Sequence, residues 1–246
     1  MAETVERTDA TSSVTENWLR LARGAAITMV VWAIILQLTA RVIIPPVLVI
    51  GVVFAGFVPF LRDGRRRVAL GLAIFSFLAL GGNIPGLVDE LTHLSSAPAF
   101  ILTLLSFQGA VVAIIAGVGA FRSRNVPPTR RVVSVAAAAF VVFAATSIGV
   151  AATTDSDVAQ AGDVQVVAEK VKFNPDEIRV SVGDGIWVDN KDGIRHTFTI
   201  EDAGVDLAIP ALKAKRIDLD LAAGTYDVIC GVPGHESMVG TLVVEN

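Results

Sequence analysis

The chain is poor in the side chains that most often bind metals or form covalent links. Its 246 residues include one cysteine, three histidines and three methionines. A single cysteine excludes an internal disulfide and a paired-cysteine zinc site. Only one histidine, His93, precedes His196. A haem held by two histidines between helices in the first part of the chain is therefore excluded.

Apolar residues, by contrast, are abundant and unevenly distributed. They make up 53% of the chain, and the mean hydropathy is +0.63, whereas an ordinary soluble domain is about 45–50% apolar. Residues 1–152 carry 12 Lys/Arg against 7 Asp/Glu, and residues 153–246 carry 8 against 17. The composition predicts a helical membrane domain at residues 24–152, followed by a polar and acidic domain.

Five apolar runs in the first part are candidate membrane helices, because a hydrocarbon core about 30 Å thick takes roughly 20 helical residues to cross. They cover residues 24–43, 45–61, 68–88, 99–121 and 132–152. Pro45 and Pro46 mark the turn between the first two runs. The third run is interrupted by the sequence GGNIP at residues 81–85. It either continues through a kink or forms a re-entrant segment.

The basic residues predict the orientation, because Lys and Arg concentrate in short cytoplasmic loops. Eleven arginines lie before the first run, between the second and third, and between the fourth and fifth: Arg7, Arg20, Arg23, Arg62, Arg65, Arg66, Arg67, Arg122, Arg124, Arg130 and Arg131. The other loops contain only Arg41. We therefore expect a multi-pass protein of the cell membrane, with residues 1–23 in the cytoplasm and the C-terminal domain outside. The first run could instead be a signal peptide cleaved near Ala40, which would leave that domain outside.

From residue 163 onwards, short strand-like runs alternate with turns. Strands are predicted at residues 164–169, 177–182, 185–190, 196–200, 213–219, 225–230 and 240–244. In the second of these, Ile178, Val180 and Val182 should face the core, and the sequence RIDLDL at residues 216–221 repeats the alternation. About seven short strands indicate an antiparallel sandwich or a flattened barrel. Residues 153–162 are small and polar, which favours a flexible linker.

One loop near the C-terminus contains most of the soft side chains. Cys230, His235 and Met238 lie in the sequence CGVPGHESM, and His196 opens a predicted strand upstream. An antiparallel sandwich can bring that strand beside the final hairpin. Two imidazoles, a thiolate and a weak thioether are the ligand set of a blue-copper electron-transfer site. The three stronger ligands could also hold zinc, but the thioether favours copper.

The last third of the chain resembles the cupredoxins, small copper proteins of the plastocyanin and azurin kind. The resemblance is carried by FNPDEIRVSVGDGIWVDNKDGIRHTFTI at residues 173–200 and by YDVICGVPGHESMVG at residues 226–240. It implies an all-β Greek-key sandwich over residues 163–246 that binds one type 1 copper ion. The implied equatorial ligands are His196, Cys230 and His235, with Met238 as the long axial ligand. The N–H of Thr197 is implied to donate to the cysteine sulfur.

The resemblance also implies where electrons enter and leave. His235 should reach the surface through an apolar patch supplied by Val232, Pro233 and Met238, whereas His196 should be buried. The electron-transfer surface is therefore expected at Val232, Pro233 and His235.

These expectations favour a carrier of single electrons that is not an enzyme, because four protein ligands leave no open position on the metal. The expected partners are the bilayer and redox proteins such as cytochromes or a terminal oxidase or reductase, with no nucleic acid. The helices would keep the carrier near its partners. A copper-handling or copper-sensing membrane protein is one alternative, and a helical transporter or assembly protein regulated by copper is another. One cysteine excludes a binuclear purple-copper site, and three histidines are too few for multicopper oxidases or copper nitrite reductases.

Overall fold

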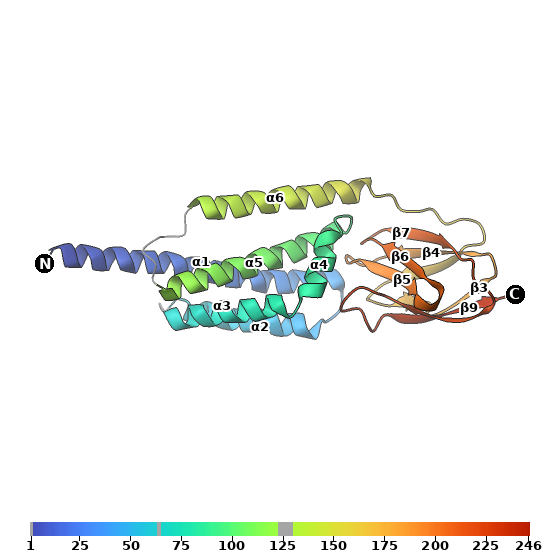
Figure 1. The fold of residues 1–246 in the computed structure, drawn as a ribbon, viewed down its shortest axis with the longest axis horizontal. Coiled ribbons are helices and arrows are strands. Elements are labelled where there is room, and N and C mark those ends of the chain that lie inside the picture. The colour runs from blue at the N-terminus through green and yellow to red at the C-terminus, as the bar shows by residue number, and fades with distance from the viewer. Residues whose placement is uncertain (1, 63–64, 123–129) are drawn as a thin grey trace. The chain divides into compact units, whose positions relative to one another are not determined.

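The computed structural model describes residues 2–62, 65–122 and 130–246, and it contains a helical part and a β-sandwich (Figure 1). The chain forms two compact units. The first contains residues 1–38, 43–84 and 102–143, and the second contains residues 39–42, 85–101 and 144–246. The second unit therefore combines the β-sandwich with two short segments, Thr39–Val42 and Pro85–Ile101, that come from the apolar half of the sequence.

Six helices form the apolar half of the described chain. They are α1 (Ala2–Ala40), α2 (Pro45–Phe60), α3 (Arg66–Gly81), α4 (Ile84–Thr92), α5 (Ala97–Arg122) and α6 (Arg130–Thr153). Pro45 and Pro46 occupy the first turn of α2, where a backbone N–H has no helical partner and proline costs nothing. The predicted turn between the first two apolar runs is confirmed.

The five predicted membrane spans are not confirmed. Three helical segments are long and apolar enough to cross a membrane: Ser13–Ala40, Ala97–Arg122 and Val133–Thr153. Helices α3 and α4 would together form a fourth, but they are bent by 67° at the break that GGNIP predicted. Helix α2 has only 16 residues, or about 24 Å of helix, which is shorter than a hydrocarbon core. Arg124, used above to predict orientation, lies outside the described residues.

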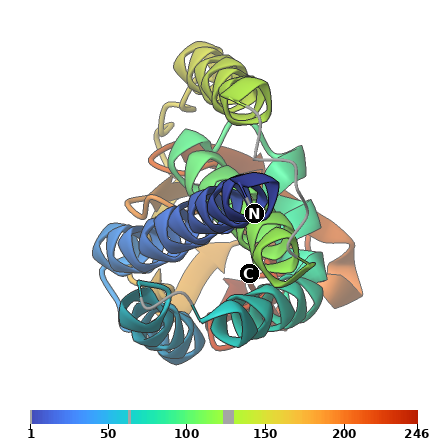
Figure 2. The same ribbon diagram turned by 90° about the vertical axis from the view of Figure 1, so that its left-hand side faces the viewer.

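The first unit is held together by small side chains, and Figure 2 shows its helices nearly end-on. Its buried core contains seven alanines, from α1, α3 and α5, together with Phe54 and Leu72. Helices α3 and α5 approach closely at Gly117 of α5, where an added Cβ would lie 2.2 Å from the carbonyl oxygen of Ala69 in α3. Small residues allow helix backbones to approach closely in this way.

The β-sandwich consists of nine strands in two sheets. The strands are β1 (Val164–Ala168), β2 (Phe173–Asn174), β3 (Glu177–Ser181), β4 (Gly185–Asn190), β5 (His196–Ile200), β6 (Val205–Ile209), β7 (Ala214–Asp218), β8 (Gly224–Ile229) and β9 (Val239–Glu245). One sheet has the order β2-β1-β4-β7 and the other has the order β3-β9-β8-β5-β6. The β1–β4 and β3–β9 pairs are parallel, so the sandwich is mixed and not purely antiparallel. Each of these pairs joins strands that are not connected by a hairpin.

All seven predicted strands are present, and two were missed. Strand β2 has only two residues, too few for a period to be visible, and β6 was not recognised in the sequence VDLAI. Ile178 and Val180 are buried as predicted, whereas Val182 is 53% exposed because β3 ends at Ser181. The core between the sheets is built from large apolar side chains, including the fully buried Phe198.

The segment after α6, where the sequence predicts a flexible linker, forms hydrogen bonds with the sandwich through Asp157. The backbone N–H of Asp157 donates to the carbonyl of Ala214 at 3.0 Å. The Asp157 carboxylate accepts from the backbone N–H of Arg216 and from the ammonium of Lys215. The indole N–H of Trp187 donates to the carbonyl of Asp157 at 2.8 Å. Polar composition predicts solvent exposure, but it does not show that a carboxylate has partners on a neighbouring strand.

Candidate metal centre

Three of the four predicted ligands come together because of the pairing between two strands. Thr199 of β5 lies opposite Ile229 of β8, so the start of β5 lies beside the end of β8. His196 is the first residue of β5 and Cys230 follows β8 directly. His235 lies in the loop between β8 and β9, and Met238 ends that loop.

The ligand atoms of the cluster lie close together. The Cys230 Sγ is 3.8 Å from Nδ1 of His196 and 3.6 Å from Nδ1 of His235. The ligand atoms of these three residues all lie within 4.8 Å of one another. His196 and Met238 are 0% and 1% exposed, and Cys230 is 5% exposed. Within the described ranges this is the one cluster of at least three histidine, cysteine or acidic side chains close enough to share a metal ion.

The ligand loop is fixed by its own backbone. The N–H of Cys230 donates to the carbonyl of Met238 at 3.0 Å, and the N–H of Met238 donates to the carbonyl of His235 at 2.8 Å. The N–H of His235 donates to the carbonyl of Val232 at 3.0 Å. Gly234 has a φ of +89°, a conformation that glycine adopts at little cost. The sequence CGVPGHESM therefore closes into a compact turn that holds its three predicted ligands at one end of the hairpin.

The ring of His196 is oriented by Asp192, a residue that the sequence analysis missed. The Nε2 of His196 lies 2.9 Å from Oδ2 of Asp192, and because a carboxylate only accepts, Nε2 carries the hydrogen. The other nitrogen, Nδ1, then faces Cys230 with its lone pair. Histidine ligands of metals are commonly oriented by a carboxylate in this way. The signal in the sequence was the aspartate four residues before His196, in NKDGIRH.

Asp192 is itself held by several hydrogen bonds. Its carboxylate accepts from the backbone N–H groups of Lys170 and Val171 at 2.9 and 3.1 Å. The N–H of Asp192 donates to the side chain of the buried Asn190 at 2.9 Å. The Asn190 amide also donates to the carbonyls of Ile194, Ile209 and Pro210. The turn before His196 is therefore rigidly connected to β1, β4 and the loop after β6.

The pKa values of Cys230 and His196 are shifted in ways that suit metal ligands. Burial raises the pKa of the Cys230 thiol, but hydrogen bonds with His196 and His235 and from backbone N–H groups outweigh it and lower the pKa to about 5. Burial lowers the pKa of His196, but the bonds to Asp192 and Cys230 outweigh it and raise the pKa. The site therefore holds a thiolate at neutral pH. Thiolate is the form of cysteine that binds metals.

Thr197 contributes to the site as predicted, through its backbone. Its N–H donates to Sγ of Cys230 at 3.4 Å, a bond that stabilises negative charge on sulfur. Its hydroxyl accepts from the N–H of Gly231 at 2.7 Å and from the hydroxyl of Thr199 at 2.8 Å. Cys230 and the residue after it are thus hydrogen-bonded to β5.

The surface near His235 differs from the predicted apolar patch. His235 is partly exposed and His196 is buried, in line with the expectation. Val232 and Met238, however, are 3% and 1% exposed and belong to the core of the sandwich. Pro233 remains exposed, as do Gly234, Glu236 and Ser237. The exposed part of the loop is therefore smaller and more polar than the sequence suggested, because the apolar loop residues pack inward beside Cys230.

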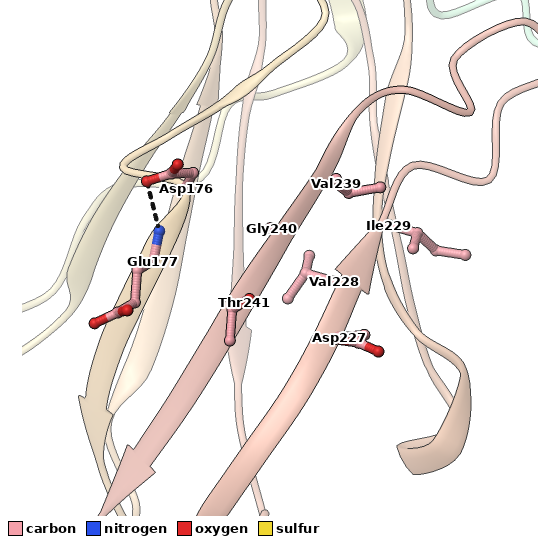
Figure 3. Close-up of a pocket in the computed structure, with 8 residues that line it drawn as sticks. All are labelled: Asp176, Glu177, Asp227, Val228, Ile229, Val239, Gly240 and Thr241. Carbon is pink, nitrogen blue, oxygen red and sulfur yellow. Dashed lines mark hydrogen bonds between the residues drawn. The ribbon is translucent and has the colours of Figure 1, made fainter.

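An open depression lies along β8 and β9, next to the ligand-bearing ends of these strands (Figure 3). Its lining residues are Asp176, Glu177, Asp227, Val228, Ile229, Val239, Gly240 and Thr241. The backbone N–H of Glu177 donates to the Asp176 carboxylate at 3.0 Å. Its carboxylates face solvent and none of the four predicted ligands lines it, so the depression is separate from the cluster.

Comparison with known proteins agrees with this geometry. A family model described as a cupredoxin-like domain matches residues 134–244. Amicyanin-alpha of Methylorubrum extorquens is 32% identical over 116 residues, which cover 44% of this chain and 95% of the relative. The structure of a reduced amicyanin mutant is 28% identical, covers 35% of this chain and 86% of its own, and has a TM-score of 0.31. A copper-containing nitrite reductase from Thermus scotoductus is 19% identical, covers 38% of this chain and 25% of its own, and has a TM-score of 0.30.

The likeness therefore rests on sequence and on the chemistry of the site. The buried thiolate, the two imidazoles and the methionine are a donor set that fits copper better than a hard cation. Because the alignment takes in almost the whole of the amicyanin, this chain belongs to the cupredoxin family, and copper is the cofactor of its His-Cys-His-Met cluster.

Proposed function

We propose that the protein is a membrane-anchored type 1 copper protein that transfers single electrons between redox partners outside the cytoplasmic membrane. The observation that carries the proposal is the buried cluster of His196, Cys230 and His235, with the Thr197 N–H directed at the cysteine sulfur. Met238, buried at the end of the same loop, supplies the fourth donor.

When bound, copper would supply exchange of one electron between its Cu(I) and Cu(II) states. The protein's part is to keep the donors in place. Asp192 holds the His196 ring, and the Thr197 N–H and the loop backbone hold Cys230. Donors held by the fold rather than by the metal move little when the charge changes, which favours fast electron transfer. Because the donors are buried and four in number, no position is left for a substrate, and the protein acts as a carrier and not as an enzyme.

The helical part serves as the anchor in this proposal. Three segments of suitable length and apolarity support insertion in a membrane. The arginines before the first apolar run, between α2 and α3, and between α5 and α6 support an orientation with the N-terminus in the cytoplasm and the copper domain outside. Tethering to the membrane raises the effective concentration of the carrier beside membrane-bound redox proteins.

The partners would approach the ligand loop where it is exposed, at Pro233 and His235. Val232, which the resemblance places on this surface, would act from beneath it by supporting the loop. Residues 153–246 carry 8 Lys/Arg against 17 Asp/Glu, so a partner with a basic surface, such as a cytochrome, would be attracted at long range. That attraction falls with salt, because the screening length is about 10 Å at 0.1 M.

The test is a visible spectrum of the full-length protein, purified in detergent and loaded with Cu(II). We expect one copper per chain and an intense blue colour from charge transfer between the Cys230 thiolate and the metal. Cys230→Ser should lose the colour, whereas His93→Gln, which changes the one histidine outside the cluster, should keep it. A wild-type protein that binds one copper and stays colourless would refute the proposal.

A further inference from the structure

A short stretch of the apolar half packs against the β-sandwich beside the copper site. This stretch, Pro85–Ile101, is called the cover segment below; it belongs to the same compact unit as the sandwich. It contains most of α4, the loop after it and the first turn of α5. Asp89 of the cover segment forms an ion pair with Arg195, the residue immediately before the ligand His196.

The ion pair is partly buried. The side chain of Arg195 is 6% exposed and that of Asp89 is 21% exposed. Glu90, also in the cover segment, lies within electrostatic range of Arg195 and of His235. Removing one member of a buried ion pair leaves the other charge unpaired in a poorly solvated place, which is strongly unfavourable. Replacing either Asp89 or Arg195 should therefore destabilise the packing of the cover segment on the sandwich.

A second, uncharged contact holds the cover segment to the same end of the sandwich. The backbone N–H of Ala211 donates to the hydroxyl of Ser96 at 3.1 Å, and Ser96 is fully buried. A Cβ added to Gly193 would lie 2.6 Å from Cγ2 of Thr39 and 3.9 Å from Cβ of Pro98. The turn before His196 and the loop after β6 thus both contact residues from the apolar half.

The two contacts involve the turn just before His196 and the loop after β6. Arg195 and Gly193 belong to the turn that Asp192 and Asn190 organise, and Ala211 follows Pro210 in the same network. The loop residues Pro233, Gly234, Glu236 and Ser237 remain exposed.

From this arrangement we infer that the cover segment is a built-in docking partner of the copper-site end of the sandwich. It closes the side formed by Gly193–Arg195 and Ala211, and leaves the ligand loop between Val232 and Met238 as the open side. External molecules then reach the cluster over the loop that carries His235. The consequence for redox partners rests on the proposed function, but the docking itself does not.

Hydrogen exchange on the metal-free, full-length protein in detergent tests the docking. We expect Asp89→Ala to accelerate amide exchange by about tenfold or more in the cover segment, in residues 191–195 and at Ala211, because both faces of the contact lose protection together. Ser96→Ala, which removes the uncharged contact, should act at the same places to a smaller extent. Glu245→Gln, which breaks an exposed ion pair with Arg179 in β3, should leave these amides unchanged.

Extraction of Cu(I) by a bulky anionic chelator tests the consequence. We expect extraction from Asp89→Ala to be about tenfold faster than from the wild type, and extraction from Glu245→Gln to be unchanged. Faster exchange confined to the cover segment, with residues 191–195, Ala211 and copper extraction unchanged in both variants, would overturn the inference. A wild-type protein that loads copper without colour would refute the proposed function alone, because the exchange experiment needs no metal.

Discussion

The two halves of this chain bury their cores with different side chains. Seven of the twelve buried core residues of the helical unit are alanines, and large apolar side chains such as Leu38, Ile43 and Phe77 are exposed. The sandwich buries phenylalanine, isoleucine, leucine and valine, and its surface is largely polar. In water, burying a large apolar side chain is the main source of stability. In a bilayer, lipid solvates such side chains equally well, so helices associate through close packing of small residues. The exposed apolar side chains and small core residues of the helical unit are compatible with a membrane protein, and the sandwich has the core and surface of a domain in water.

The strongest test of this comparison is a large residue at the close contact between α3 and α5. Gly117→Leu places atoms against the backbone of α3, which cannot rotate away as a side chain could. We expect a loss of more than about 4 kcal/mol in stability or failure of the helices to assemble. Gly56→Leu, at a glycine with no atom within 4 Å of the added Cβ, is the matched control. Thermal unfolding in detergent measures both, and similar stabilities for the two variants would contradict this account of the packing.

The corresponding change in the sandwich removes a large side chain instead. Phe198 is fully buried and packs edge-on against Phe173, with ring centroids 5.7 Å apart. We expect Phe198→Ala to cost about 3–5 kcal/mol through lost burial and the cavity left behind. Val182→Ala, at an exposed valine, should cost much less. Denaturant unfolding followed by β-sheet circular dichroism gives the two values. If both variants lower the free energy of unfolding by less than about 1 kcal/mol, the buried side chain of Phe198 does not stabilise the sandwich as described.

A smaller effect is expected at the residue that orients the first histidine. Asp192→Asn keeps the size of the side chain but removes the charge that holds Nε2–H of His196. We expect copper affinity to fall by about 10–100-fold. Asp218→Asn, a change at an exposed aspartate in β7, should have no effect on affinity. Competition titrations with a copper chelator measure the difference, and equal affinities in all three proteins would show that Asp192 does not position the ligand.

The smallest effect concerns the attachment of the segment after α6, and it depends on pH. Burial raises the pKa of Asp157, but the N–H of Arg216 and the ammonium of Lys215 outweigh it and lower the pKa. A lowered pKa means that the carboxylate stabilises the fold above its unfolded pKa of about 3.9, and that this stability is lost as the pH falls through the folded pKa.

We therefore expect Asp157→Asn to cost about 1 kcal/mol at pH 7, with faster exchange of the Arg216 amide. The difference from the wild type should disappear once the pH falls below the lowered, folded-state pKa of Asp157. A difference that stays constant down to that pH would mean that the charge of Asp157 does not matter.

The local features of the sandwich could be predicted because they depend on neighbouring residues. Alternation placed Ile178 and Val180 in the core, and turn residues separated the strands. The ligands could be predicted because Cys230, His235 and Met238 are close in sequence and chemically rare in this chain. Asp192 could not, since aspartates are common here and only the contact with His196 distinguishes it. In the apolar half, hydropathy located the apolar runs but did not show where each helix ends. The 67° bend at residues 81–85 and the 16-residue length of α2 depend on where the backbone turns.

By itself, the sequence determined the division into an apolar and an acidic half, the strand periods and the donor atoms of the metal cluster. Each of these follows from side-chain chemistry and from periods of a few residues. Only the tertiary structure decided which of the loop's apolar residues turn inward, that Asp192 holds the ring of His196, and that Asp89 reaches Arg195 from 106 positions away. Such contacts depend on how the backbone brings distant residues together. Many weak interactions spread along the whole chain determine that path, and a short stretch of sequence contains only a few of them.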